Sequence, residues 1–346
     1  MIGLLAQTAT FTERIVDPFV GAGFVINFLV LGSLYSLIAV GFVIIFKSTQ
    51  VLNFAHGAIA ALGAYFTWVT VTHWNIPGRF FPPDSPFVIG NTESFWQPRV
   101  LTWVTALILA ALMAAALGWL MERLFIEPMV GEPIFSVAII TLGMEIVLRT
   151  IYTDFLGSLA RPMGDPFGFN GWRWEIGEKT LLVFWSQPFI IASTVILAIL
   201  LVLFFRSKYG VAMRATAFDQ EAAMIQGIPV RRIFALAWVI GGLLAAFAGT
   251  FSATAPPRFR GADPLLPLLA FRALPAVVVG GLDSIIGAFA GGFIVAFFEI
   301  FLPTYFTTLS SYVGQGFEAV VPYAVMLVFL IIKPYGLFGT EEIRRV

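Results

Sequence analysis

Residues 20–46 read VGAGFVINFLVLGSLYSLIAVGFVIIF and contain no charged side chain. A run of about 20 apolar residues is long enough for an α-helix to cross the hydrocarbon core of a bilayer. Since an open strand in hydrocarbon would leave its backbone groups unpaired, such runs are predicted to be helical. Eight further apolar segments follow, at residues 51–71, 100–121, 134–152, 181–205, 233–253, 265–281, 285–302 and 317–332. The sequence therefore predicts an all-α, polytopic membrane helical bundle of about nine spanning or broken helices, with residues 1–346 forming a single transmembrane domain.

The composition of the chain agrees with a membrane location. Hydrophobic residues make up 59% and charged residues 12% of the sequence, and the mean hydropathy is +0.91. Soluble domains contain roughly 45–50% apolar residues. The 20 basic and 20 acidic residues cancel, so bulk charge gives no indication of nucleic acid as a partner. The sequence has no cysteine, which excludes a disulfide framework and a thiol nucleophile. With only two histidines as well, it predicts no metal site.

Two long connections interrupt the apolar pattern, at residues 72–99 and 153–180. Both are rich in Pro, Gly and Trp, which is typical of structured loops at a membrane surface. Aromatic side chains of such loops contact membrane lipid. We expect both loops on the extracytoplasmic side and the polar connection at residues 206–232 on the cytoplasmic side. Ten basic residues are cytoplasmic in this orientation and ten lie elsewhere, two of these within or at the edge of apolar segments, but the charge of the short connections favours this orientation.

The connection at residues 206–232 carries five basic and two acidic residues, a net charge of +3, so it belongs in water. Thr216 followed by Asp219 resembles the start of a helix, and Gly227 with a proline two residues later is a stop signal. The pattern predicts a short helix over residues 217–226. Such a helix either projects toward a soluble partner or is a solvated loop without one.

The stretch EAAMIQG, Glu221–Gly227, resembles the EAA-type loop of ABC importer permeases, in which an Ala-rich helix followed by Gly docks into a cleft on the ATPase subunit. The flanking residues 209–251, together with residues 31–66 and 274–299, resemble specifically the branched-chain amino acid permease branch. The resemblance implies coupling to the ATPase through Arg214, Asp219, Glu221, Ala222 and Gly227.

The same resemblance implies the partners. It predicts a second permease subunit, two cytoplasmic ATPase subunits that carry ATP and Mg, and an extracytoplasmic solute-binding protein, all at a bacterial cytoplasmic (inner) membrane. GFVIIFKS, Gly41–Ser48, has the outer Gly, the Lys and the Ser of a phosphate loop, but Phe46 replaces the second Gly. We therefore expect a transport subunit that is not an enzyme and holds no cofactor of its own.

Polar residues near apolar segments are candidates for a translocation path or gate. Asn53, His56 and Gly57 stand at the start of one such segment. We favour hydrogen bonds from Asn53 and His56 to a neighbouring helix end, with gating or loop positioning as the alternative. GAFA at residues 287–290 resembles GAIA at residues 57–60, which suggests two pseudo-repeated halves.

Charged residues within the spans extend this set. Glu145 and Arg149 are four residues apart, so they are predicted to pair along one helix face, either as an interfacial anchor or in the path. Arg272 and Glu299 have no obvious partner nearby in the sequence. If a zwitterionic amino acid crosses here, these two charges could meet its carboxylate and ammonium groups, or they could serve a subunit interface.

The sequence thus predicts the permease subunit of an ATP-binding-cassette importer for branched-chain amino acids or similar small solutes. A permease of the same family for urea or short amides is the alternative, because an apolar path does not separate these solutes. An ion-coupled secondary transporter would leave the EAA-like loop unexplained. An intramembrane hydrolase has little support without paired catalytic groups.

Overall fold

The computed structural model describes residues 14–74, 100–129, 132–167, 170–176, 179–255, 261–307, 312–314 and 316–339. The α-helices in chain order are α2 (Pro18–Thr49), α3 (His56–Val69), α5 (Val100–Met121), α6 (Ile134–Leu156), α7 (Ser186–Arg206), α8 (Lys208–Phe218), α9 (Gln220–Ile225), α10 (Val230–Thr254), α11 (Leu268–Gly280), α12 (Ile285–Tyr305) and α14 (Val321–Ile332). Short π or 3-10 turns follow or precede some of them, namely η1 (Thr70–Trp74), η2 (Glu122–Ile126), η3 (Glu127–Met129) and η4 (Phe317–Ala319).

Every predicted apolar segment contains a helix, and the helical membrane bundle is confirmed. Six of the described helices are long and apolar enough to cross a membrane. The apolar helix Leu268–Gly280 is shorter. At a rise of about 1.5 Å per residue, its 13 residues extend roughly 20 Å, less than the ~30 Å hydrocarbon core. The expected count of about nine spans is therefore not confirmed.

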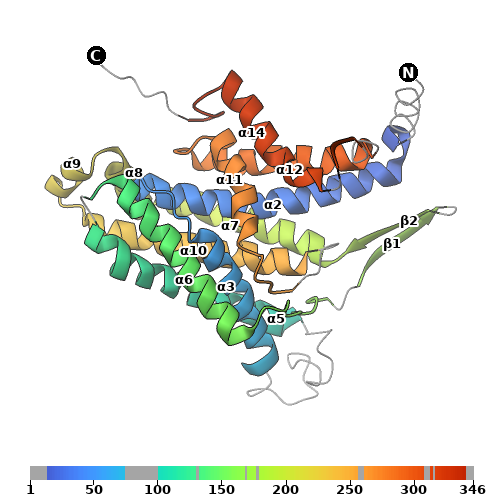
Figure 1. Cartoon of the computed structure of the whole chain (residues 1–346), viewed down its shortest axis with the longest axis horizontal. Helices are drawn as coiled ribbons and strands as arrows, with labels where there is room; N and C mark the ends of the chain where they lie inside the picture. Colours follow the sequence, from blue (N-terminus) through green and yellow to red (C-terminus); the bar gives the residue numbers. More distant parts are fainter. Residues whose placement is uncertain are drawn as a thin grey trace.

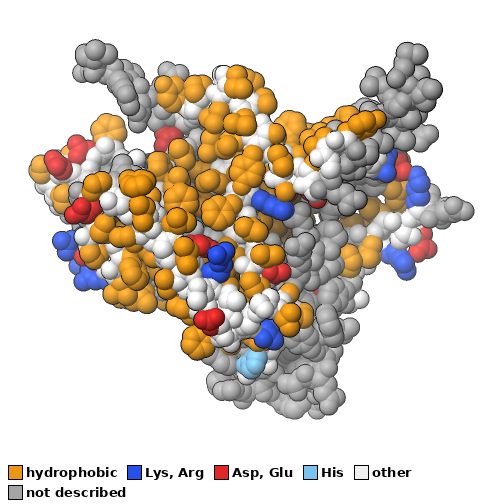
Figure 2. Space-filling model, viewed as in Figure 1, with side chains coloured by type: hydrophobic (Ala, Val, Ile, Leu, Met, Phe, Trp, Pro, Cys, Tyr) orange, Lys and Arg blue, Asp and Glu red, His pale blue; other side chains and the backbone are white. Residues whose placement is uncertain are grey.

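Helix α2 is the centre of the bundle. It packs against α12, α10, α11 and α7, and the side chains from Val30 to Ile45 are buried without interruption. Helices α6 and α7 lie at the periphery, because few of their apolar side chains are buried. Figure 2 shows hydrophobic side chains over most of the face that α6 crosses.

Small residues allow α3 and α10 to pack in close contact. A Cβ atom added at Gly249 of α10 would overlap the carbonyl oxygen of Ala60, and one added at Gly63 of α3 would overlap the backbone of Ala246. Small residues at such interfaces let the backbones of membrane helices approach each other closely. This contact fixes α3 beside α10 in the interior.

Proline within α11 frees a backbone acceptor that another helix uses. Pro275 has no N–H to donate to the carbonyl of Phe271, four residues earlier. The hydroxyl of Tyr323 on α14 donates to that carbonyl at 3.2 Å. A tertiary hydrogen bond thus replaces the missing helical one, and it holds α14 against α11.

A β-hairpin is the one element type that the prediction missed. Strands β1 (Gly171–Ile176) and β2 (Lys179–Phe184) pair antiparallel, so residues 181–184 begin the predicted segment at 181–205 as a strand and not as a helix. The hairpin lies beyond the helices, where β1 alternates Trp172 and Trp174 with polar residues (Figure 1). Outside hydrocarbon, paired strands are as acceptable as helix, which is why the all-helical rule failed here.

The hairpin and α9 lie at opposite ends of the longest axis of the molecule, and α2 and α10 run along that axis between them (Figure 1). Charged side chains lie at both of these ends, and others are scattered across the middle of the visible face (Figure 2). Lys179 of β2 forms an ion pair with Asp17, which caps the start of α2. The predicted loop at residues 72–99 lies outside the described residues from position 75 onward.

Candidate functional site

The polar connection between α7 and α10 forms two helices where the sequence predicted one. Helix α8 continues through Thr216, whose hydroxyl donates to the carbonyl of Ala212 at 3.0 Å. The chain breaks at Asp219, which is extended and accepts a hydrogen bond from the N–H of Ala222 at 2.9 Å. Asp219 is therefore the N-cap of α9, and the predicted start at Thr216 was wrong, because an N-cap carboxylate satisfies the free N–H groups of a new helix.

The end of α9 agrees with the sequence. Gly227 has a φ of +78°, in the left-handed region that glycine adopts without steric cost. Its N–H donates to the carbonyl of Met224 at 2.9 Å. An added Cβ would meet no atom within 4 Å, so the requirement for glycine is conformational and does not come from packing.

The outer surface of this turn is apolar. Phe218 is 94% exposed and Ile225 is 84% exposed, while Ala223 on the opposite side packs against Val230 and Phe234. Exposed apolar patches that are rimmed by polar residues mark binding surfaces. Glu221 and Ala222 lie on the same exposed turn. We name this surface, residues 218–226, the coupling surface, after the role that the sequence resemblance predicts for it.

Ionic and polar contacts connect the neighbourhood of the coupling surface to the bundle. Arg214 of α8 donates to the carbonyl of Phe205. Glu127 of η3 pairs with Arg123 and also, at 3.1 Å, with Arg231 at the start of α10. Both ends of the connection are therefore attached to the spans next to them.

The sequence around Asn53 is an irregular stretch between α2 and α3. Asn53 is fully buried, and its side-chain oxygen accepts from the N–H of Ala55 at 3.1 Å. Thr141 of α6 accepts from the N–H of Phe54 at 3.2 Å and donates to the carbonyl of Leu52 at 3.3 Å. Side chains thus satisfy the non-helical backbone, as they must at membrane depth.

His56 and Gly57 lie in the packed interior. The ring of His56 packs against Phe42 in a tilted arrangement, with 4.6 Å between the ring centroids, and it also lies against Gly41 of α2. Among the residues that the structure describes, neither ring nitrogen of His56 forms a hydrogen bond of normal distance and angle. An added Cβ at Gly57 would lie 2.6 Å from the carbonyl oxygen of Pro267. Both residues therefore hold α3 against neighbouring elements by close packing.

Glu145 and Arg149 pair along α6 as predicted, with 3.8 Å between Oε1 and Nε. The arginine side chain is half exposed and the glutamate is buried. This geometry places the charge of Arg149 at the outer surface of the bundle.

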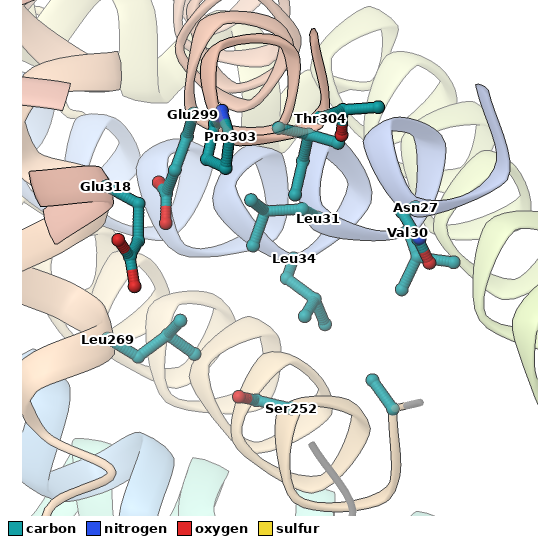
Figure 3. A pocket seen from close by; sticks show the side chains of 12 residues that line it. Asn27, Val30, Leu31, Leu34, Ser252, Leu269, Glu299, Pro303, Thr304 and Glu318 are labelled. Carbon is teal, nitrogen blue, oxygen red and sulfur yellow. The ribbon is translucent and has the colours of Figure 1, made fainter. Parts of the chain in front are cut away.

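Glu299 of α12 is only 1% exposed. The hydroxyl of Tyr35 on α2 donates to its Oε2 at 2.6 Å, so its partner is distant in sequence. Glu299 lines a cavity of about 260 Å³, into which Glu318 of η4 also points (Figure 3). Arg272 lines a neighbouring cavity of about 330 Å³ that shares Glu318.

Sequence reasoning missed Tyr35 and Glu318. Tyr35 lies between Ser33 and Ser36 in a long apolar run, and Glu318 is a lone carboxylate at the start of the last apolar segment. A polar group inside an apolar segment was the available signal in both cases.

The described residues contain no group of three His, Asp or Glu side chains able to hold a metal ion. Residues 41–48, which partly match a phosphate loop, lie within α2. Their N–H groups point along the helix axis and are not arranged as a phosphate cradle.

Comparisons with known proteins place the sequence in a family. Residues 24–330 match the family described as branched-chain amino acid transport system / permease component. The chain is 29% identical to the high-affinity branched-chain amino acid transport system permease protein LivH of Escherichia coli (strain K12), over 92% of this chain and 96% of that protein. It is 27% identical to BraD of Pseudomonas aeruginosa, a permease protein of a system with the same description, over 93% and 96% of the two chains.

A more distant relative is the probable branched-chain amino acid transport permease protein LivH of Methanocaldococcus jannaschii, 24% identical over 90% of this chain and 91% of that protein. The solved structure of PsaBC from Streptococcus pneumoniae in complex with Fab covers 90% of this chain and 92% of its own, at 15% identity and a TM-score of 0.41. With the family match extending over most of the sequence, the chain belongs to the permease components of branched-chain amino acid transport systems.

Proposed function

We propose that this chain is a permease subunit of an ATP-driven importer that moves branched-chain amino acids or similar small solutes across a bacterial cytoplasmic membrane. The main support for this proposal is the family match over residues 24–330. By the pattern of such systems it works with a second permease subunit, two cytoplasmic ATPase subunits that bind ATP and Mg, and an extracytoplasmic solute-binding protein.

The coupling surface is where the ATPase docks in this proposal. Its apolar side chains Phe218 and Ile225 are exposed, and Asp219 and Gly227 fix both ends of α9. A cleft on a soluble subunit would cover these side chains, and movement of that subunit would reach the spans through α8 and α10. Arg214, Glu221 and Ala222 complete the coupling set.

The orientation in this proposal places α9 in the cytoplasm and the β-hairpin outside. Their positions at opposite ends of the long axis support it (Figure 1). We further propose that α3, α11 and α14 enter the membrane beside the six long helices, which gives nine segments. Gly57 and Gly287, each near the start of its helix directly after a polar break, support two pseudo-repeated halves.

The path for the solute is proposed to run beside α2 through the cavities at Glu299 and Arg272. Asn53, His56 and Gly57 hold α3 in register beside that path, and Glu145 contributes from α6. Solute selectivity rests mainly with the binding protein.

Reconstitution of the permease in vesicles tests the proposal. With its ATPase and binding protein present, uptake of radiolabelled L-leucine should require ATP, and the permease alone should hydrolyse no ATP. Ala222→Trp should reach the membrane in normal amount but lose association with the ATPase, because a large side chain would not fit a cleft shaped for alanine. Solute movement by the permease alone, driven by an ion gradient, would refute the proposal and favour a secondary transporter.

A further inference from the structure

A cavity of about 520 Å³ lies beside the coupling surface. Its walls come from the C-terminal end of α2, the end of α8, the turn between α11 and α12 and the segment after α14. The cations Lys47 and Arg214 line it together with Phe46, Phe218 and Tyr335. None of its described lining residues also lines the two cavities proposed for the solute path. Ligand sites have volumes of about 300–1,000 Å³ and combine apolar walls with a few polar groups, so this cavity has the size and lining of a ligand site.

Hydrogen bonds between these elements fix the walls of the cavity. The ammonium group of Lys47 donates to the backbone carbonyl of Asp283 at 3.0 Å, which attaches the end of α2 to the turn after α11. The N–H of Leu337 donates to the carbonyl of Val279 at 2.9 Å, which attaches the segment after α14 to the end of α11. A site whose walls are already in place loses less conformational entropy when a ligand binds. The cavity is therefore suited to binding without rearrangement.

The two cations of this cavity form no ion pair with any residue that the structure describes. Arg214 donates to the carbonyl of Phe205, and Lys47 donates to that of Asp283, so both keep N–H donors for a further acceptor. Asp283 is the one carboxylate among the described lining residues, which gives the lining a net charge of +1. Two like charges in one cavity repel each other, and an anion bound between them would be attracted by both.

The position of the cavity along α2 matches the level of lipid headgroups. Lys47 lies two residues before the end of a 32-residue helix. Such a helix extends about 48 Å, more than the ~30 Å hydrocarbon core, so its last turn lies among polar groups. Arg214 belongs to the polar connection at residues 206–232, which is cytoplasmic in the proposed orientation. Basic side chains at this level attract the anionic lipids of the cytoplasmic leaflet.

We propose that this cavity binds an anionic phosphate group at the cytoplasmic membrane surface. The planar guanidinium of Arg214 offers parallel N–H donors to two phosphate oxygens, and Lys47 offers a second cation. One negative charge neutralises the lining. Phe46 contacts the apolar part of a lipid that carries the phosphate, whereas free phosphate uses the two cations alone. The bound phosphate links α2 to α8 next to Phe218 of the coupling surface.

The test measures lipid binding to the full-length chain, purified with its partner subunits, by native mass spectrometry. The probes are phosphatidylglycerol, which is anionic, and phosphatidylethanolamine with the same acyl chains, whose ammonium group cancels the phosphate charge. The wild type should bind its first phosphatidylglycerol about tenfold more tightly than phosphatidylethanolamine. Lys47→Gln and Arg214→Gln, compared in complexes of the same subunits, should each weaken phosphatidylglycerol binding about tenfold, since each removes a charge-assisted hydrogen bond. Lys47→Arg keeps the charge and should keep the preference.

The matched control is Lys208→Gln at the start of α8, where the ammonium group lies over the ring of Tyr209 and outside the cavity lining. It should leave phosphatidylglycerol binding within about twofold of the wild type. Inorganic phosphate added as a competitor distinguishes the two sources of the ligand. Displacement of phosphatidylglycerol would assign the site to soluble phosphate, and retention would assign it to the lipid; either result supports a phosphate site.

Three results would overturn the inference. The first is phosphatidylglycerol binding within about twofold of the wild type in both Gln variants, and the second is equal affinity of the wild type for the two lipids. The third is loss of partner subunits from Lys47→Gln with unchanged lipid binding, which would assign the cations to an acidic group of the ATPase. ATP-dependent uptake of L-leucine by the wild type, measured separately, tests the proposed transport function whichever way lipid binding turns out.

Discussion

Substitution of Gly227 by alanine tests the coupling surface most directly. The φ of +78° lies where an L side chain clashes with its own backbone, at a cost of roughly 1–2 kcal/mol. Because an added Cβ would meet no atom within 4 Å, no packing penalty adds to this cost. A difference of that size lowers the population of the native turn about 5- to 30-fold. ATP-dependent uptake of L-leucine in vesicles should fall accordingly, while the amount of folded protein in the membrane stays constant.

Two control variants make this prediction specific. Gly227→Asn should retain most of the uptake, because asparagine tolerates the left-handed region better than other residues with a side chain. Gly143→Ala in α6 should be neutral or slightly stabilising, since that glycine is helical and its added Cβ would also meet nothing within 4 Å. Normal uptake by Gly227→Ala at normal membrane amounts would show that the geometry of this turn is irrelevant to coupling.

Three further variants probe the bundle and the hairpin. Gly249→Val should sharply reduce folded yield, measured by size-exclusion chromatography, because its side chain would overlap a carbonyl of α3; a normal yield would contradict the close contact. Tyr35→Phe removes the donor to buried Glu299 and should lower the free energy of unfolding in detergent by about 1–3 kcal/mol; an unchanged unfolding curve would contradict this. The hydrogen bond from Lys179 holds the pKa of Asp17 below its ordinary value of 3.8, so the ion pair stabilises the hairpin above that pH and is lost as the pH falls through the lowered pKa. The protection of residues 171–176 and 179–184 against hydrogen exchange should fall in that range in the wild type, whereas Asp17→Asn should show lower protection at neutral pH and no such transition.

Helix positions could be predicted because backbone N–H and C=O groups in hydrocarbon must be paired within the segment, which a helix achieves. The run at residues 20–46 lies within α2, and the stop at Gly227 was read correctly because only glycine favours that turn. The break at Asp219 was missed for a different reason. Capping motifs can be read in more than one register, and the sequence around Thr216 fits an earlier start as well as the observed one.

The residues that share a cavity could not be predicted, because tertiary packing decides them. Glu299 of α12 accepts a hydrogen bond from Tyr35 of α2, which is 264 positions away in the sequence. Nothing in local spacing indicates that pairing, whereas Glu145 and Arg149 could be paired in advance because a helix brings residues four apart onto one face. The hairpin formed by residues 171–176 and 179–184 was missed because the membrane rule predicts helices alone.

The length of α2 gives it the geometry of a lever. Its 32 residues extend about 48 Å at 1.5 Å per residue, and Tyr35 lies near its midpoint. A tilt of about 5° around that point would displace each end by roughly 2 Å, enough to separate Lys47 from the carbonyl of Asp283, which it now contacts at 3.0 Å. The hydrogen bond from Tyr35 to Glu299 would persist as the fulcrum. Spin-label distances to a fixed position on α5, measured with and without ATP, should therefore change more at Thr49 than at Ser33, and equal changes would rule out tilting about Tyr35.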